Sequence, residues 1–96
     1  MYAVAIIRYR RPLEEVLVHQ DPHRAYLRGL KEQGTLIASG PCNPRFGGIL
    51  LLRVADDDWQ ALDGVRDNDP FVQNGVAQYE LLGWNPVIGR DDLDKL

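Results

Sequence analysis

The 96-residue sequence has one cysteine, one methionine and no long apolar run. A single cysteine, Cys42, excludes an internal disulfide and fits a reducing compartment. No base stands beside Cys42 in the sequence, so we favour a bystander thiol over a nucleophile. The apolar start Tyr2–Ile7 lacks the basic flank of a signal peptide, and no segment approaches the roughly 20 apolar residues of a membrane span. We therefore expect a cytoplasmic protein with no membrane contact.

Basic residues are also in short supply. The 11 Lys and Arg are outnumbered by 14 Asp and Glu, which gives a net charge of −3. A nucleic-acid footprint is usually basic and clustered, so this balance argues against nucleic acid as a partner. There is no internal repeat and no linker, and the length predicts a single domain over residues 1–96. Residues 89–96 are expected to form a charged surface tail.

Four segments have the composition of β-strands, and their limits are predicted from turn residues. Tyr2–Tyr9 is apolar on both faces, which predicts a strand covered on both sides. Thr35–Ser39 is a second strand that we expect Gly40-Pro41 to end. Ile49–Val54 is an almost unbroken apolar run and predicts a central strand, and Val76–Trp84 is the last strand.

Helical signals lie between these strands. Pro12 begins a short helical stretch, and Asp21 with Pro22 is expected to cap a longer helix that runs towards Gly34. His23 shares a face with apolar residues four and seven positions later, so it is expected to face the sheet. His19 is interpreted as an exposed histidine or one that caps the short first helix.

Asp56–Asp58 precedes a further helix, whose buried face is predicted to consist of Trp59, Leu62 and Val65. Consecutive helical positions do not converge on one ion, so we favour a capped helix start over a metal site. In the next turn, Asp69 is a good N-cap before Pro70. Spacing alone favours this capping role of Asp69 over a catalytic one.

The element order is β-α-β-β-α-β, which predicts an α+β, ferredoxin-like fold with a four-stranded antiparallel sheet. Two helices cover only one face of such a sheet. The other face carries apolar side chains from the first and third strands, so we expect it to pack against a second copy in a homodimer.

The sequence resembles the YCII-related (YciI-like) family of the dimeric α+β barrel superfamily. The resemblance rests on the following residues: Pro22-His23, Gly34, Leu36, Gly40-Pro41, Asp69-Pro70-Phe71, Gly75 and Trp84. It implies that His23 and Asp69 form a dyad in a cleft, with Phe71 beside the substrate. Many members have arginine three residues before the histidine, where this chain has Gln20.

A His-Asp pair with no adjacent serine or cysteine suggests proton transfer more than acyl transfer. Ser39 either hydrogen-bonds a substrate or satisfies a strand edge, and we favour the edge. Arg8 either meets an anionic substrate or pairs with an acid across the dimer.

The first hypothesis is a small cofactor-independent enzyme, a lyase or isomerase, acting on a small metabolite. The alternative is a non-enzymatic dimer that binds a small ligand with the dyad as its polar anchor.

Overall fold

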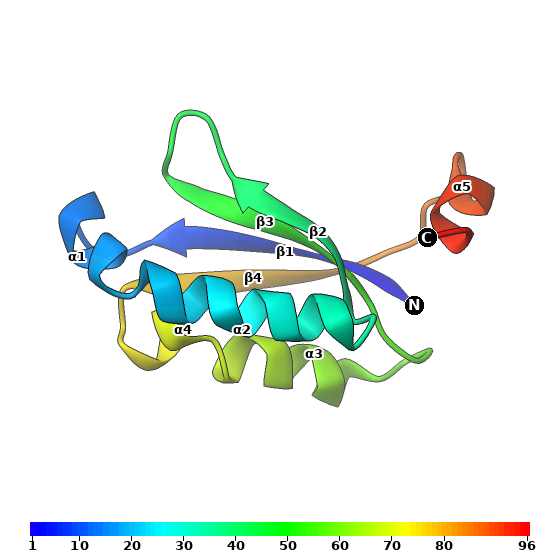
Figure 1. Ribbon diagram of the computed structural model, residues 1–96. Helices are drawn as coiled ribbons and strands as arrows, with labels where there is room; N and C mark the ends of the chain where they lie inside the picture. Colours follow the sequence, from blue (N-terminus) through cyan, green and yellow to red (C-terminus); the bar gives the residue numbers. More distant parts are fainter.

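The computed structural model describes residues 1–96 and contains one sheet whose two longest helices lie on one side of it (Figure 1). The strands are β1 (Tyr2–Tyr9), β2 (Leu36–Pro41), β3 (Gly47–Arg53) and β4 (Ala77–Trp84). The helices are α1 (Leu13–Val18), α2 (Gln20–Glu32), α3 (Trp59–Asp67), α4 (Pro70–Gln73) and α5 (Arg90–Asp94). No helix combines the length and the apolarity that a membrane crossing requires.

The sheet has the strand order β2-β3-β1-β4, and every neighbouring pair is antiparallel. Helices α2 and α3 run along the same face of the sheet, while α5 stands apart at the other end of the molecule (Figure 1). This is the α+β, ferredoxin-like fold expected from the element order. The sheet's second face has no covering layer within the chain apart from α5 at one end.

The edge strand β2 is longer than predicted. Gly40 and Pro41, expected to end it, pair with Ile49 and Gly48 of β3. The prediction was wrong because β2 lies at the edge of the sheet, where proline's missing N–H removes no ladder hydrogen bond. The remaining strands begin and end within two residues of the predicted limits.

The start of α2 also differs from the prediction. The helix begins at Gln20, its N-cap residue is His19, and no side chain caps it, so Asp21 lies inside the first turn. His19 is also the C-cap residue of α1, and its N–H donates to the carbonyl oxygen of Val16 at 3.0 Å. With a single residue between the helices, no separate capping turn forms at Asp21.

The core lies between the helices and the inner face of the sheet. Small residues of β1, Ala3 and Ala5, are fully buried and let α2 and α3 approach closely. His23, Leu27 and Leu30 are all buried along α2, as their spacing predicts. Trp59, predicted to be buried, is 47% exposed, because it begins α3 at the rim and lies over Gly83 of β4.

Two of the three consecutive aspartates have partners, and the partners differ. Asp58 caps α3 by accepting the N–H of Ala61 at 3.0 Å, and Asp56 pairs with the amino terminus of Met1 at 2.9 Å.

The charged tail, residues 89–96, is partly helical because α5 forms there. Asp94 of α5 accepts a 2.6 Å hydrogen bond from the hydroxyl of Tyr2. Tyr2 is thereby buried at one end of the sheet's second face.

Gly47 provides a test of the β1–β3 pairing. A Cβ at this position would lie 1.7 Å from the carbonyl oxygen of Ile7. That oxygen belongs to the backbone of β1, so the two strands would have to separate. We expect Gly47→Ala to lower the free energy of unfolding by about 3 kcal/mol, measured by denaturant titration at one protein concentration.

Gly40→Ala is the matched control, since a Cβ at Gly40 meets nothing within 4 Å. It should change the free energy of unfolding by no more than about 0.5 kcal/mol. Equal unfolding midpoints for the two variants would contradict the strand pairing described here.

Candidate functional site

The site is built on the turn that contains α4. Asp69 is the N-cap residue of this single helical turn, and its Oδ1 accepts the N–H of Phe71 at 2.9 Å. Pro70 occupies the first helical position, and Gly75 follows the helix with a φ of +69°. This is the predicted capping arrangement. The side chain of Asp69 is fully buried, so the cap holds a carboxylate inside the protein.

Helix α2 brings His23 to this carboxylate. Nδ1 of His23 lies 2.8 Å from Oδ1 of Asp69, although 46 residues separate the two in the chain. The contact expected between them is therefore present. The ring of Phe71 stacks on the imidazole, with centroids 3.8 Å apart and planes within 6°. The imidazole is thus held both at its edge and on one face.

A third donor to the carboxylate comes from β4. The hydroxyl of Tyr79 donates to Oδ2 of Asp69, a role the sequence analysis did not assign. The signal was present, because the alternation of β4 places Tyr79 on the helix-covered face with Ala77 and Leu81. Together the imidazole, the tyrosine and a backbone N–H satisfy this buried carboxylate.

The hydrogen bond also sets which imidazole nitrogen carries the proton. An ionised carboxylate only accepts hydrogen bonds, so Nδ1 of His23 is the protonated nitrogen beside Asp69. Nε2 then has a free lone pair when the ring is neutral. All fully buried side-chain nitrogens and oxygens in the chain have a hydrogen-bond partner. Nε2 has no such partner, so it is not fully buried, and His23 lines the open space beside it.

That space is a cavity of about 450 Å³ between α2 and the β2–β3 hairpin. Its volume lies in the range of small-ligand sites. His23, Phe71 and Ser39 all line it, so these three residues named from the sequence come together. The hydroxyl of Ser39, for which we favoured a strand-edge hydrogen bond, makes none and is exposed.

Arg8 is not part of this cavity. It lies on the opposite face of the sheet, where its Nη1 forms a 2.7 Å ion pair with Oε1 of Glu80 in the same chain. Alternation along β1 explains this separation, because Ile7 and Tyr9 face the cavity and Arg8 between them faces away. The single chain therefore does not place Arg8 near His23.

Arg45, from the β2–β3 loop, lines the cavity and was not identified from the sequence. Its Nη2 donates to Oε1 of Gln20 at 2.6 Å and its Nε donates to the hydroxyl of Tyr9 at 3.3 Å. Gln20 thus holds an arginine supplied by another segment.

Two tyrosines around Asp69 have perturbed acidity. Burial, followed by the negative charge of Asp69, raises the pKa of Tyr26 to about 12. Burial raises the pKa of Tyr79 further above its ordinary value, with the charge of Asp69 and its hydrogen bond adding to the effect. Both phenols therefore stay neutral around physiological pH, and that of Tyr79 can act as a donor to the carboxylate.

Comparison with known proteins places this geometry in a family. The model of the YCII-related domain matches residues 1–85, which include β1 to β4 as well as His23 and Asp69. The chain belongs to the YCII-related family. α5 lies outside the matched residues.

Among the solved structures that are similar to this YCII-related protein, one covers most of its length. It is 5-chloro-2-hydroxyhydroquinone dehydrochlorinase (TftG) from Burkholderia phenoliruptrix AC1100, in complex with 2,5-dihydroxybenzoquinone. The TM-score is 0.73 at 23% identity, and the match covers 88% of this chain and 94% of the other. This likeness establishes the fold. No curated protein matches the chain.

The tyrosines next to Asp69 give a prediction for alkaline pH. In the folded protein the phenols of Tyr26 and Tyr79 should not ionise below about pH 11, whereas unfolded tyrosine ionises near pH 10. Because the folded pKa is raised, the associated stability is complete below about pH 10 and is lost as the pH rises towards the folded value. Tyrosinate absorbance measures the ionisation.

The controls are Tyr26→Phe and Tyr79→Phe, each titrated in its native form and in denaturant. In denaturant, each variant should show one tyrosine ionisation fewer than the wild type. In the native protein, the titration below about pH 11 should be the same as that of the wild type. If native Tyr79→Phe lacked a tyrosinate signal that the native wild type shows near pH 10, Tyr79 would ionise as an ordinary tyrosine. That result would contradict its buried hydrogen bond to Asp69.

Proposed function

We propose that this YCII-related protein is a small enzyme in which His23 transfers a proton on a small metabolite, in a reaction of the lyase or isomerase type. The supporting observation is the orientation of the imidazole. Nδ1 is bound to a buried carboxylate, and Nε2 has no partner within the chain on a residue that lines a cavity of ligand size. A base held in this way can take a proton at Nε2 without turning its ring.

Asp69 supports this role as a positioning residue. Its carboxylate orients the ring and stabilises the imidazolium that forms when Nε2 accepts a proton. Phe71 restricts the ring further, because it stacks on one face at 3.8 Å. No serine or cysteine hydrogen-bonds the imidazole, which favours proton transfer over attack by a protein nucleophile. No step of this reaction requires a cofactor.

The structural neighbour suggests where to look for substrates. It is named as a dehydrochlorinase, and loss of hydrogen chloride requires removal of a proton, the task proposed for His23. We therefore propose small cyclic compounds with ionisable C–H or O–H groups, such as hydroquinones and lactones, as substrates. The apolar share of the lining, which includes Leu27, Leu50 and Phe71, fits a flat ring.

The proposed function is tested by measuring turnover and ligand binding on the same proteins. Wild type and His23→Gln are assayed on a panel of hydroquinones and lactones that begins with 5-chloro-2-hydroxyhydroquinone. We expect His23→Gln to lower kcat/KM by about 10² or more while the Kd for 2,5-dihydroxybenzoquinone changes little. Binding of panel compounds without turnover by the wild type would favour the alternative, a ligand-binding protein.

Asp69 variants separate positioning from capping. Asp69→Asn keeps an oxygen for the N–H of Phe71 but cannot stabilise imidazolium, so it should lose turnover and keep most of its stability. Asp69→Ala should lose both, with the cap alone contributing about 0.5–2 kcal/mol. If Asp69→Asn retained full turnover, the carboxylate would be only a structural cap.

We further propose that the chain is a homodimer whose subunits pack through the second face of the sheet. That face carries half-buried Val4 and Ile6 and the exposed side chains of Ile49, Leu82 and Trp84, which are 42–45% exposed. Continuous apolar surface of this kind on a sheet marks an interaction site. α5 covers one end of the face at Tyr2, so the rest of the face is available to the second subunit.

Light scattering with chromatography tests the dimer. The wild type should have the mass of two chains, with on the order of 1,000 Å² or more buried in total. Leu82→Glu, in the middle of the face opposite Val4, should produce monomers. Ile88→Glu is the control, since Ile88 is 97% exposed and lies beyond β4. A wild-type monomer at micromolar concentration would contradict the proposal.

A further inference from the structure

The charges around the cavity are all of one sign. The lining residues include Arg24, Arg28, Lys31 and Arg45, and none of them is Asp or Glu. The whole chain has more acidic than basic residues, with a net charge of −3. An acid-free lining therefore differs from the average composition of this protein and concentrates positive charge at one place.

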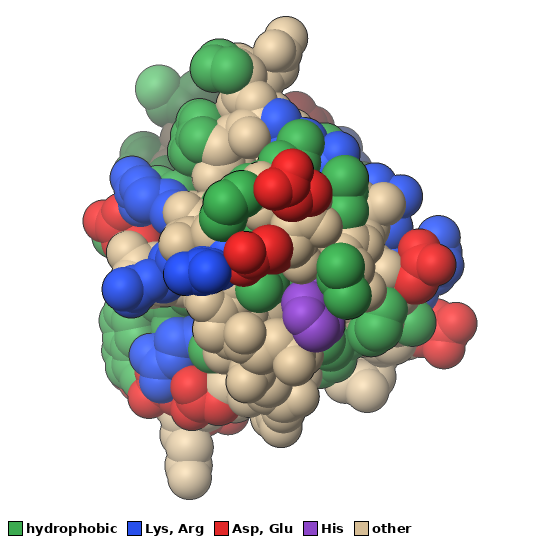
Figure 2. All heavy atoms as spheres, turned by 90° about the vertical axis from the view of Figure 1, so that its left-hand side faces the viewer, with side chains coloured by type: hydrophobic (Ala, Val, Ile, Leu, Met, Phe, Trp, Pro, Cys, Tyr) green, Lys and Arg blue, Asp and Glu red, His purple; other side chains and the backbone are tan.

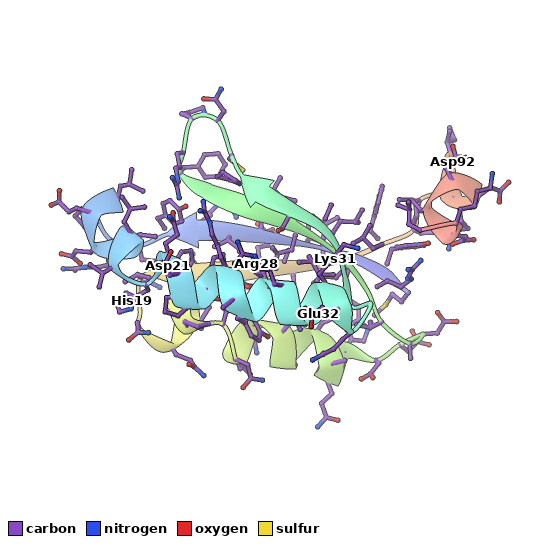
Figure 3. The ribbon with its side chains drawn as sticks, viewed as in Figure 1. His19, Asp21, Arg28, Lys31, Glu32 and Asp92 are labelled. Atoms are coloured by element: carbon purple, nitrogen blue, oxygen red, sulfur yellow. The ribbon has the colours of Figure 1, made fainter.

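Three of these cations come from one stripe of α2. Arg24, Arg28 and Lys31 are spaced i, i+4, i+7, so they share a face of the helix. The stripe adjoins the buried stripe that begins at His23 and runs about 10 Å along the axis. Figure 3 shows Arg28 and Lys31 on the side of α2 towards the β2–β3 hairpin.

The cavity cations have no acidic partner within the chain. Elsewhere, several basic side chains are paired with acids: Arg8 with Glu80, Arg11 with Glu15, and Arg66 with Asp63 and Asp67. Arg10 and Arg90 instead donate to the amide oxygens of Gln78 and Asn85. Arg24, Arg28 and Lys31 form no ion pair, and Arg45 donates only to neutral oxygens.

The positive lining is a local feature of the cavity. At the end of the molecule that carries α1, basic and acidic side chains are intermingled with hydrophobic ones (Figure 2). Adjacent free cations repel one another, and a bound anion would relieve that repulsion. The cavity is therefore arranged to attract a ligand of opposite charge.

We propose that the cavity takes a small anionic molecule whose carboxylate, or another oxyanion, is held by the basic stripe and Arg45. Resting on the proposed function, this inference places the reactive group of the same molecule at Nε2 of His23. Arginine forms paired hydrogen bonds with a planar carboxylate. The anion would sit at the exposed wall, while the apolar part lies against the buried residues of the cavity.

The experiment compares benzoate with benzamide, which have the same shape and differ in charge. Binding is followed by NMR through the arginine Nε–H and backbone amide signals. We expect benzoate to shift the signals of Arg24, Arg28 or Arg45 and to bind about tenfold more tightly than benzamide. Added salt should weaken the binding of benzoate and leave that of benzamide unchanged. Phenyl phosphate, as a third probe, shows whether the oxyanion is a phosphate.

The double variant Arg24→Gln with Arg28→Gln should abolish the preference for benzoate. Both residues are exposed and glutamine is a good helix former, so the fold should be kept. Arg10→Gln removes one positive charge from an exposed residue that does not line the cavity and should leave the preference intact. Equal response to benzoate and benzamide, or no response to either at millimolar concentration, would overturn the proposal.

The same probes separate this inference from the proposed function. His23→Gln keeps all four cations, so it should retain the preference for benzoate even though the proposed turnover is lost. If the charge preference is present but His23→Gln retains turnover, only the proton-transfer proposal fails. If turnover depends on His23 but charge has no effect on binding, only the anion proposal fails.

Discussion

The buried carboxylate of Asp69 is the interaction on which the rest of the site depends. A carboxylate removed from water is costly unless its oxygens are hydrogen-bonded. Here the donors come from α2, from the turn of α4 and from β4, through His23, the N–H of Phe71 and Tyr79. The hydrogen bonds of this one carboxylate therefore join α2 to the turn of α4 and to β4, although His23 and Asp69 are 46 residues apart in the chain. The orientation of the imidazole follows from this requirement.

Helix α2 has two functions that its sequence separates into two stripes. One stripe, His23, Leu27 and Leu30, is buried against the sheet and closes the core. The neighbouring stripe is basic and forms a wall of the cavity. The cavity exists because the β2–β3 hairpin extends alongside α2 as an edge that no other helix covers. The hydrophobic packing that stabilises the domain thus also positions charged groups beside His23.

The sheet divides the chain's chemistry between its faces. On the covered face, small residues of β1 let the helices approach, and Ile7 and Tyr9 reach the cavity. The second face has apolar residues in the middle, an ion pair between Arg8 and Glu80, and α5 at one end. An apolar sheet face without a covering layer is unfavourable in water, which is the physical basis for expecting a second subunit there.

Much of the local structure was determined by the sequence alone. The cap at Asp69, the limits of β1 and the inward direction of His23 depend on residues a few positions apart, where capping and periodicity apply. The same local rules were wrong at Gly40-Pro41 and Trp59, because being at a sheet edge or a helix rim is a property of the fold. The pairing of His23 with Asp69 was expected only from family resemblance. The part of Tyr79 and the convergence of Arg45 on the basic stripe were decided by tertiary structure, since local sequence carries no information on which distant segments pack together.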